Sequence, residues 1–189
     1  MPKIILLSGC KRCGKDTVAN RLMERLPNSI KVAFADPLRE ICSIAFGFNM
    51  EHYGDDLKEV KVEEWGMSPR DALIKVGTEL FRKQIDPDIW VKATINRIKK
   101  SDAEYIFITD ARFHNELEMV KNAFPNHYSF LVIRPEVVPK NGIESAHVTE
   151  HFGILESLNP TYNFNSIFIN NNLEEVDNCV ENIYNMIIL

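Results

Sequence analysis

A glycine-rich segment near the start of the chain has the residue types and spacing of a phosphate-binding loop. It runs from Gly9 to Thr17 and contains the pattern Gly-x-x-x-x-Gly-Lys, which ends at Gly14 and Lys15. Glycines allow successive backbone N–H groups to turn inward around a phosphate. A following helix N-terminus and a lysine add positive charge at the same place. The sequence therefore predicts that this loop binds the phosphates of a ligand.

One position departs from the common form of such a loop. Asp16 occupies the place where Ser or Thr normally holds Mg²⁺, and Thr17 follows one residue later. Carboxylate and hydroxyl oxygens are both suitable Mg²⁺ ligands, so Asp16 and Thr17 are candidate metal ligands. Lys11 and Arg12 lie inside the loop, and we expect them to contribute to the same phosphate site.

Charged side chains also follow the second and third predicted strands. Asp36 and Arg39 follow the second strand, and Asp110 and Arg112 follow the third. An acid at such a strand end can bind Mg²⁺ or orient a phosphate acceptor, and an arginine can hold a phosphate with two parallel hydrogen bonds. The alternatives are that Asp36 caps a helix beside a solvated Arg39, and that Asp110 and Arg112 pair to shape a turn.

Two further arginines are candidates for phosphate binding. Arg70 lies in the first turn of a predicted helix, where a simple surface charge is the alternative. Arg134 follows the fourth predicted strand, and the chain contains no arginine after it. Charge neutralisation during phosphoryl transfer would then come from Lys15, Mg²⁺ and arginines up to this point, including Arg12.

Two short patterns are compatible with metal or redox chemistry, but their context argues against it. Cys10 and Cys13 form a Cys-x-x-Cys pattern inside the phosphate loop, and no second pair matches it. The run from His147 to His151 has the His-x-x-Glu-His spacing of a zinc protease. That chemistry needs a long helix and a third ligand, whereas Gly153 follows almost at once and the flanks have no helical pattern.

Five short apolar segments alternate with helical patterns along the chain. The predicted strands are Lys3 to Ser8, Ile30 to Ala35, Tyr105 to Thr109, Tyr128 to Ile133 and Ser166 to Asn170. This alternation is typical of an α/β fold with a parallel sheet covered by helices on both faces. Helix starts are expected at Asp36-Pro37, Ser68-Pro69 and Asp86-Pro87. The apolar positions Leu73, Val76 and Leu80 fit helical spacing in the second of these helices. Arg134 to Asn165 shows little regular pattern.

The composition narrows the class of protein further. The 189 residues carry a formal net charge of -5 with a pI of about 5.6, which gives no basic surface for nucleic acid. No apolar run approaches the roughly 20 residues of a membrane span. Four cysteines do not make a disulfide framework in a chain of this length, so a cytoplasmic location is expected.

Several motifs together resemble those of phage deoxynucleoside monophosphate kinases, within the P-loop nucleoside monophosphate kinase superfamily. They are Gly-Lys-Asp-Thr at Gly14 to Thr17, the Arg70 to Phe81 stretch with Gly77-Thr78-Glu79-Leu80, Trp90-Val91-Lys92, Ile108 to Arg112, Val132 to Pro135 and His147 to Glu150. The resemblance implies a three-layer P-loop kinase fold with a five-stranded parallel sheet. It also implies one domain over residues 1–189, with an acceptor-binding insertion at about 36–98 and a lid at about 135–165.

The same resemblance implies an activity and a set of site residues. The enzyme would transfer the γ-phosphoryl group of ATP to a deoxynucleoside monophosphate, with Mg²⁺ as cofactor, and Asp16 would be normal for the family. Asp36, Arg70, Asp110 and Arg112 would belong to the acceptor and transfer site, with Arg134, His147 and Glu150 near the phosphates or the acceptor. Nucleotides would be its ligands, the host cytoplasm its location if it is phage-encoded, and a homodimer is suggested by related enzymes.

Two other functions stay open at this point. Phosphomevalonate kinase of the animal type also has a Gly-Lys-Asp loop, so a kinase for another small phosphorylated acceptor is the first alternative. A nucleotide-binding module that has lost phosphoryl transfer is the second. Several arginines at separate strand ends favour catalysis over binding alone.

Overall fold

The structure is a computed structural model that describes residues 1–54, 56–139 and 148–189. The chain divides into two compact units. Unit 1 comprises residues 1–33 and 98–189, and unit 2 comprises residues 34–97. A short 3₁₀ helix, η1 (Met50–Tyr53), belongs to unit 2.

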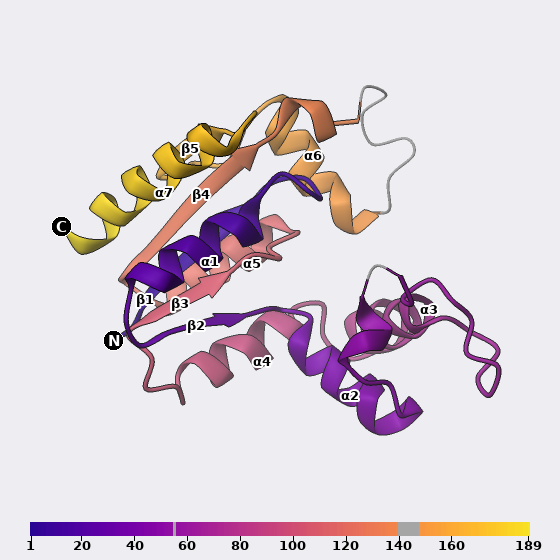
Figure 1. Ribbon diagram of the computed structural model, residues 1–189. Coiled ribbons are helices and arrows are strands. Elements are labelled where there is room, and N and C mark those ends of the chain that lie inside the picture. Colours follow the sequence, from indigo (N-terminus) through magenta and orange to yellow (C-terminus); the bar gives the residue numbers. More distant parts are fainter. Residues whose placement is uncertain (55, 140–147) are drawn as a thin grey trace. The chain divides into compact units, whose positions relative to one another are not determined.

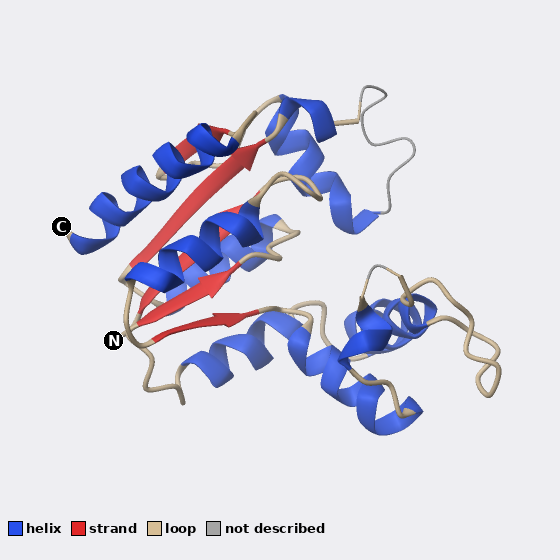
Figure 2. Ribbon diagram, in the orientation of Figure 1, coloured by secondary structure: helices blue, strands red, loops and turns tan. Residues whose placement is uncertain are grey.

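Unit 1 is built on a parallel sheet, in which the described residues form five strands (Figure 2). The strands are β1 (Lys3–Ser8), β2 (Ser29–Val32), β3 (Tyr105–Ile108), β4 (His127–Ile133) and β5 (Ser166–Ile169). Their order across the sheet is β2-β3-β1-β4-β5, and every pair is parallel. The predicted α/β fold with a five-stranded parallel sheet is confirmed. The loops after β1 and β3 are neighbours, because the carboxyl ends of parallel strands share one edge.

Helices cover both faces of this sheet. Helices α1 (Lys15–Arg25) and α7 (Leu173–Ile188) lie on one face and α5 (His114–Ala123) on the other (Figure 1). Successive residues of a strand point to opposite faces, and Ile5 and Leu7 of β1 enter the core shared with α1 and α7. Burial of such apolar side chains contributes roughly 25 cal/mol per Å² and holds the helices on the sheet.

Ion pairs join the outer surfaces of α1 and α7. Arg21 pairs with Asp177, and Arg25 Nη1 donates to Glu181 Oε2 at 2.7 Å. The partners are four residues apart on both helices, so the pairs lie one turn above each other. These contacts are exposed. Pairs of this kind contribute little to stability.

Unit 2 consists of helices around a smaller apolar core. Its helices are α2 (Asp36–Phe46), α3 (Pro69–Ile74), η2 (Lys75–Arg82) and α4 (Ile89–Ile98), whose last residue falls in unit 1. The core includes Leu38, Cys42 and Trp90. The predicted start at Ser68 is confirmed, since its hydroxyl accepts from Asp71 N at 3.1 Å and Asp71 Oδ2 accepts from Ser68 N at 3.0 Å. The expected capping role of Asp36 is wrong, because Ala35 is the N-cap and Asp36 is the first helical residue.

The helix after Ser68 changes type where the sequence predicts one continuous α-helix. From Lys75 to Arg82 it is a π-helix, η2, which has more residues per turn. The wider turn departs from α-helical spacing, and Leu80 is 50% exposed. Phe81 packs inward instead, with its ring centroid 5.1 Å from that of Trp90.

A helix also occupies the segment between β4 and β5, where the sequence predicts little regular structure. After the short η3 (Pro135–Val137), helix α6 extends from Val148 to Leu158 and passes through Gly153. Glu156 is buried and accepts hydrogen bonds from the backbone N–H groups of Thr161 and Tyr162 at 2.8 and 2.9 Å, which ties the end of α6 to the following loop. The interpretation of this segment as non-helical is wrong.

Gly153 allows α6 to pass directly over the phosphate loop. A Cβ atom at this position would lie 2.6 Å from Gly9 O and 2.8 Å from Gly9 C. Both are backbone atoms of the β1–α1 loop, so they cannot swing aside. The thiol of Cys10 also points to α6, with Sγ 3.5 Å from Gly153 O and 3.4 Å from Ser157 Oγ. Gly153 is therefore a close-contact residue and not a helix breaker.

The acceptor-binding insertion at about 36–98 and the lid at about 135–165 stay predictions, since the compact units describe packing and not function. Within the described residues, no helix is long and apolar enough to cross a membrane.

Replacement of Gly153 tests the contact between α6 and the phosphate loop. Alanine is intrinsically the better helix former by about 1 kcal/mol. We expect Gly153→Ala nevertheless to lower the free energy of unfolding by about 2 kcal/mol, because its methyl group would overlap the backbone of Gly9. Urea unfolding monitored by circular dichroism measures the change.

A matched control is the neighbouring exposed Leu155, which is 50% exposed on the same helix. Leu155→Ala changes a solvent-facing side chain and is expected to change the free energy of unfolding by less than about 0.5 kcal/mol. An unchanged or higher stability of Gly153→Ala would mean that α6 is not seated on Gly9.

Candidate functional site

The loop between β1 and α1 adopts a backbone shape that requires glycine at two places. Gly9 has φ 133° and Gly14 has φ 100°, both in the region that favours glycine. A Cβ atom on Gly9 would also lie 2.1 Å from Val132 O of β4. Gly14 is the N-cap of α1, so the loop leads directly into a helix N-terminus, where anions are favoured.

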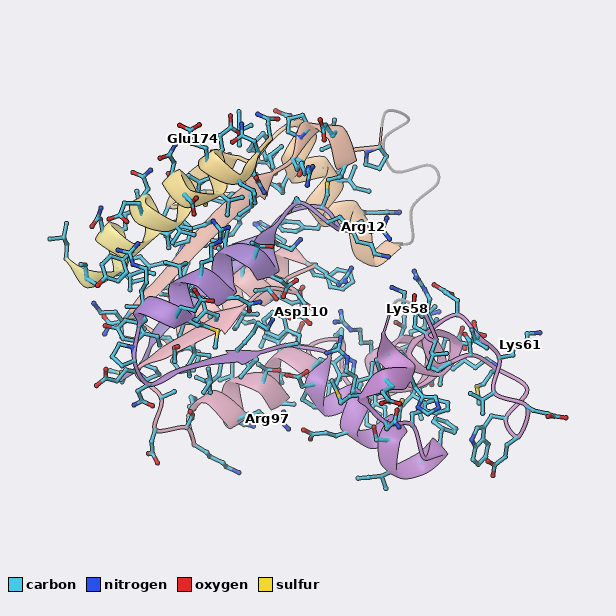
Figure 3. The ribbon with its side chains drawn as sticks, viewed as in Figure 1. Arg12, Lys58, Lys61, Arg97, Asp110 and Glu174 are labelled. Carbon is cyan, nitrogen blue, oxygen red and sulfur yellow. The ribbon has the colours of Figure 1, made fainter. Side chains whose placement is uncertain are left out.

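Arg12 lies at the tip of this loop (Figure 3). Its φ of 65° is in the left-handed region, which costs a non-glycine residue roughly 1 kcal/mol. Its side chain is exposed, as is that of Lys11. The two residues bring two cations to the loop, as the sequence predicts, and their contact with a nucleotide remains a prediction.

Lys15 points back into the loop that precedes it. Its Nζ donates to Gly9 O at 3.0 Å and to Cys10 O at 2.6 Å, and it lies 3.4 Å from Cys13 Sγ. The ammonium group is thus held by backbone carbonyl dipoles beside the loop amides. A phosphate that binds there would take over these contacts, because its full negative charge attracts the ammonium more strongly than a carbonyl does.

Lys15 shares a small hollow with the loop that follows β3. The hollow measures about 30 Å³ and is lined by Gly9, Lys11, Lys15, Thr109, Asp110, Ala111, Arg112 and Gly153. All of these residues belong to unit 1. The structure therefore brings together Lys15, Asp110 and Arg112, three of the residues predicted to act in phosphoryl transfer. A water molecule needs roughly 10–15 Å³ of such space, so the hollow holds only a few waters. A polyphosphate therefore requires the side chains around it to move outward.

A buried carboxylate that sequence reasoning missed fixes the loop after β3. Glu116 is 1% exposed, and its Oε2 accepts from the backbone N–H groups of Arg112 at 2.6 Å and Phe113 at 3.1 Å. It is the third residue of α5, where a carboxylate can bond back to the start of the helix. A glutamate at the third position of a helix was the sequence signal for this role. Glu116 orients the turn that carries Asp110 and Arg112.

Asp16 links α1 to two strands of the sheet. Its Oδ1 accepts from Thr109 Oγ1 at 3.0 Å and from Lys31 Nζ at 3.1 Å. Partial burial raises the pKa of Asp16, but the hydrogen bonds from Lys31 and Thr109 and the charges of Lys31 and Lys15 outweigh burial, so the pKa lies below its usual value. Asp16 is therefore ionised at neutral pH. No pattern in the sequence connects Lys31 with this group.

The buried side-chain amide of Asn170 also holds the phosphate loop. Asn170, just after β5, is 4% exposed and donates from Nδ2 to Cys13 O at 2.7 Å. Its own backbone N–H donates to Ile133 O at 2.7 Å, which fixes its position at the end of the sheet. Asn170 thus holds the loop in place through one carbonyl. Its location at a strand end was the only sequence signal for this role.

The oxygen groups beside the loop fit the requirements of Mg²⁺ in a kinase. Such a metal uses one or two carboxylates, together with water and substrate phosphates, and does not need a full cage of protein ligands. The described residues contain no cluster of three or more His, Cys, Asp or Glu side chains that would form such a cage. Asp110 lines the hollow beside Lys15, Thr17 is exposed in the first turn of α1, and Asp16 is already bound by Lys31 and Thr109.

The predicted acceptor residues of unit 2 are engaged with neighbouring acids. Arg39 Nη1 donates to Asp36 Oδ1 at 3.1 Å on the same helix. Arg70 Nη1 donates to Glu59 Oε1 at 2.7 Å, and its backbone N–H donates to Lys58 O at 2.9 Å. Both arginines are partly exposed, so a phosphate can compete for them. Their part in binding an acceptor stays a prediction.

The remaining predicted residues follow β4 or lie near α6. Arg134 Nη2 is 3.3 Å from Glu136 Oε2, an exposed pair. His147 lies outside the described residues. Glu150 is in α6, but its side chain is outside the part that the structure describes. Cys10 and Cys13 are buried, and they contact α6 and Lys15 as described above.

Solved structures of P-loop kinases have the same fold. A shikimate kinase from Bacteroides thetaiotaomicron matches with a TM-score of 0.54 and 13% identity, over 99% of both chains. The APS kinase of Mycobacterium tuberculosis, solved in complex with AMPPNP and APS, matches with a TM-score of 0.54 and 13% identity, over 100% of this chain and 98% of that one. At these identities the likeness establishes the fold and not the substrate.

Comparison with curated sequences confirms the resemblance to phage deoxynucleoside monophosphate kinases. The chain is 38% identical over 87 residues to the deoxynucleoside-5'-monophosphate kinase of Escherichia phage T5. The aligned stretch covers 44% of this chain and 34% of that protein. The match therefore spans about a third of the length of this relative.

A family model covers the region that contains the phosphate loop and the loop after β3. The model describes phosphomevalonate kinase and matches residues 7–126, well over half of the chain. The matched region includes Lys15, Arg70, Asp110 and Arg112, whereas Arg134 lies beyond it. With its P-loop kinase fold and this match, the chain belongs to the phosphomevalonate kinase family.

Proposed function

We propose that this protein is an ATP-dependent kinase that phosphorylates a deoxynucleoside monophosphate and releases ADP and the diphosphate. The observation that carries the proposal is the convergence of Lys15, Asp110 and Arg112 on one hollow beside a glycine-rich loop. A helix N-terminus, a lysine and an arginine together suit a polyphosphate better than any singly charged ligand.

The loop and Lys15 would bind the donor. The amides of the Gly9–Gly14 turn face a phosphate, and Lys15 exchanges its carbonyl contacts for phosphate oxygens. Because the loop is fixed by Asn170 on one side and by α6 on the other, its amides are oriented before the ligand arrives. Groups that need little reorganisation stabilise the transition state most effectively.

The transfer step would be an in-line displacement. A phosphate oxygen of the acceptor forms a bond to the γ-phosphorus of ATP, while the bond from that phosphorus to the β–γ bridging oxygen breaks and ADP leaves. Negative charge develops on the equatorial oxygens and on the leaving oxygen. Lys15 and Arg112 offset this charge. No strong general base is required, because the attacking oxygen is already largely ionised at pH 7.

Mg²⁺, when bound, would supply positive charge that offsets the negative charge of the phosphates. Asp110 and Thr17 are suited to hold it, directly or through water. Glu116 fixes the turn that carries Asp110, and Asp110 lines the same hollow as Lys15.

Two sequence matches support candidate acceptors. The relative from phage T5 is described as a deoxynucleoside monophosphate kinase, and the family model as phosphomevalonate kinase. Both acceptors carry a phosphate monoester, so both would use the same arginine chemistry. The nucleotide is the first choice because the motifs around Arg70 and Trp90 resemble those of the phage enzymes. The family match favours phosphomevalonate as the second candidate.

An assay of ADP release against a panel of acceptors tests the function. We expect deoxynucleoside monophosphates to stimulate ADP release from Mg-ATP more than ribonucleoside monophosphates or phosphomevalonate do. Lys15→Met is expected to lower turnover at least about 100-fold, because it removes the cation that offsets transition-state charge. Circular dichroism of the variant checks that the fold is intact.

The outcomes of this assay separate the candidate functions. Preference for phosphomevalonate would support the second candidate, and release of ADP with none of the acceptors would support a nucleotide-binding module. Near-normal turnover of Lys15→Met would contradict the role given to this lysine.

The role of Arg70 in acceptor binding is tested by comparing the KM values for the acceptor and for ATP. We expect Arg70→Ala to raise the KM for the acceptor about 10-fold or more, since a charge-assisted contact to phosphate is lost, and to leave the KM for ATP within about twofold. Steady-state kinetics with each substrate varied in turn measures both constants.

Glu59→Gln provides the matched control, because Glu59 is the present partner of Arg70. Freed from the acid, Arg70 is expected to bind the acceptor as well as or better than before. Equal changes in both KM values for Arg70→Ala, or no change in either, would mean that Arg70 is a surface charge with no specific part in acceptor binding.

A further inference from the structure

Lys31 is a cation of the β2 strand that the proposed mechanism does not use. Its Nζ donates to Asp16 Oδ1 at 3.1 Å and lies 3.4 Å from Asn20 Oδ1, so it bridges β2 to two residues of α1. The parallel register pairs Lys31 with Phe107 of β3, and Phe107 belongs to the core on the α1 face. Lys31 therefore projects from the sheet toward α1.

Asp16 receives a second hydrogen bond at the same oxygen. Thr109, which is 9% exposed and directly precedes Asp110, donates to Asp16 Oδ1 at 3.0 Å. One carboxylate oxygen thus connects α1, β2 and the end of β3. The connection reaches the residue next to Asp110, which lines the hollow with Lys15.

This arrangement is poorly suited to direct metal binding by Asp16. A Mg²⁺ ion coordinates oxygen at 2.0–2.1 Å in a nearly ideal octahedron. On Oδ1 it would lie close to the ammonium group of Lys31, and the two positive charges would repel each other. Coordination would also replace the hydrogen bond from Thr109, which holds the strand end in place.

We propose that Lys31 is a positioning residue, which holds Asp16 as a bridge between α1 and the end of β3 and keeps this carboxylate out of the Mg²⁺ coordination sphere. The inference rests on the proposed function, in that it concerns the metal of the same phosphoryl-transfer site. It assigns Asp16 to orienting the Thr109–Asp110 turn and leaves metal binding to Asp110 and Thr17.

The contribution of Lys31 is expected in metal binding and not in stability. The Lys31 side chain is 37% exposed and that of Asp16 is 66% exposed, and exposed ion pairs stabilise a fold only slightly. Loss of the lysine leaves the carboxylate without its cation, so the carboxylate becomes available to a divalent metal. Removal of Lys31 should then strengthen metal binding, which is the opposite of what loss of an ordinary structural contact does.

Direct measurement of Mn²⁺ binding tests the proposal without catalysis. Electron paramagnetic resonance of free Mn²⁺, titrated with protein and ADP, gives the Mn²⁺ dissociation constant of the complex. We expect Lys31→Met to lower this constant about threefold and Lys31→Arg to leave it unchanged, because arginine keeps the charge. Asp16→Asn is expected to leave the constant unchanged, and the double variant to behave as Asp16→Asn does.

Arg21→Met is the matched control, because it removes an exposed ion pair from the same helix on the side facing α7. It should leave the Mn²⁺ dissociation constant at the wild-type value. A weaker Mn²⁺ affinity in Asp16→Asn would overturn the proposal, since it would make Asp16 a ligand in the native protein. An effect of Lys31→Met no different from that of Arg21→Met would also overturn it.

Failure of the proposed function gives a different result. If the protein is no kinase, acceptor-stimulated ADP release is absent in wild type, whereas the Mn²⁺ pattern of the Lys31 and Asp16 variants is unaffected. If only the positioning role of Lys31 is wrong, wild type still shows acceptor-stimulated ADP release. The Mn²⁺ dissociation constants of Lys31→Met and Asp16→Asn then differ from the values expected above. Turnover measured at saturating Mg²⁺ adds a second readout, because Asp16→Asn should lower it by loosening the Thr109–Asp110 turn.

Discussion

The backbone of Gly9 is enclosed from two sides, and the candidate site depends on that enclosure. Val132 O of β4 occupies the space where a Cβ atom on Gly9 would lie. The backbone of Gly153 in α6 is also so close to Gly9 that a Cβ atom on Gly153 would overlap Gly9 O. A loop held this closely has little freedom to rearrange. Its amides, and Lys15 at its end, are therefore presented in one arrangement set by the sheet and by α6 together.

Local sequence signals predicted most of the fold. The five strands are short apolar runs, and their alternation with helices was enough to predict a parallel sheet with its loops at one edge. The residues that begin and end helices were also recognisable from short stretches of sequence. Ser68 begins a helix through its own hydroxyl, and Gly47 ends α2 with φ 70°. Of the site, the sequence predicted the loop and the strand-end residues Asp110 and Arg112, because both depend on spacing along the chain.

What the sequence could not predict depends on contacts between distant segments. Gly153 reads as a helix breaker until the backbone of Gly9 is seen beside it, and the spacing of Leu80 does not indicate the π-helix in which it is 50% exposed. Lys31 and Asn170 are ordinary polar residues in the sequence. Lys31 acquires its role by contact with Asp16, and Asn170 by contact with the carbonyl of Cys13 in the loop. Tertiary packing overrides local propensity at each of these places.

The contacts of Lys15 have a consequence for which anions the loop accepts. Its ammonium group already rests on the carbonyl oxygens of Gly9 and Cys10, at 3.0 and 2.6 Å. An anion that enters must replace these two oriented dipoles, so part of its attraction to the lysine is offset by the contacts that are lost. A triphosphate brings several charges at once and satisfies the lysine and the amides together. The resting contacts of Lys15 would therefore favour ligands with several charges over singly charged anions.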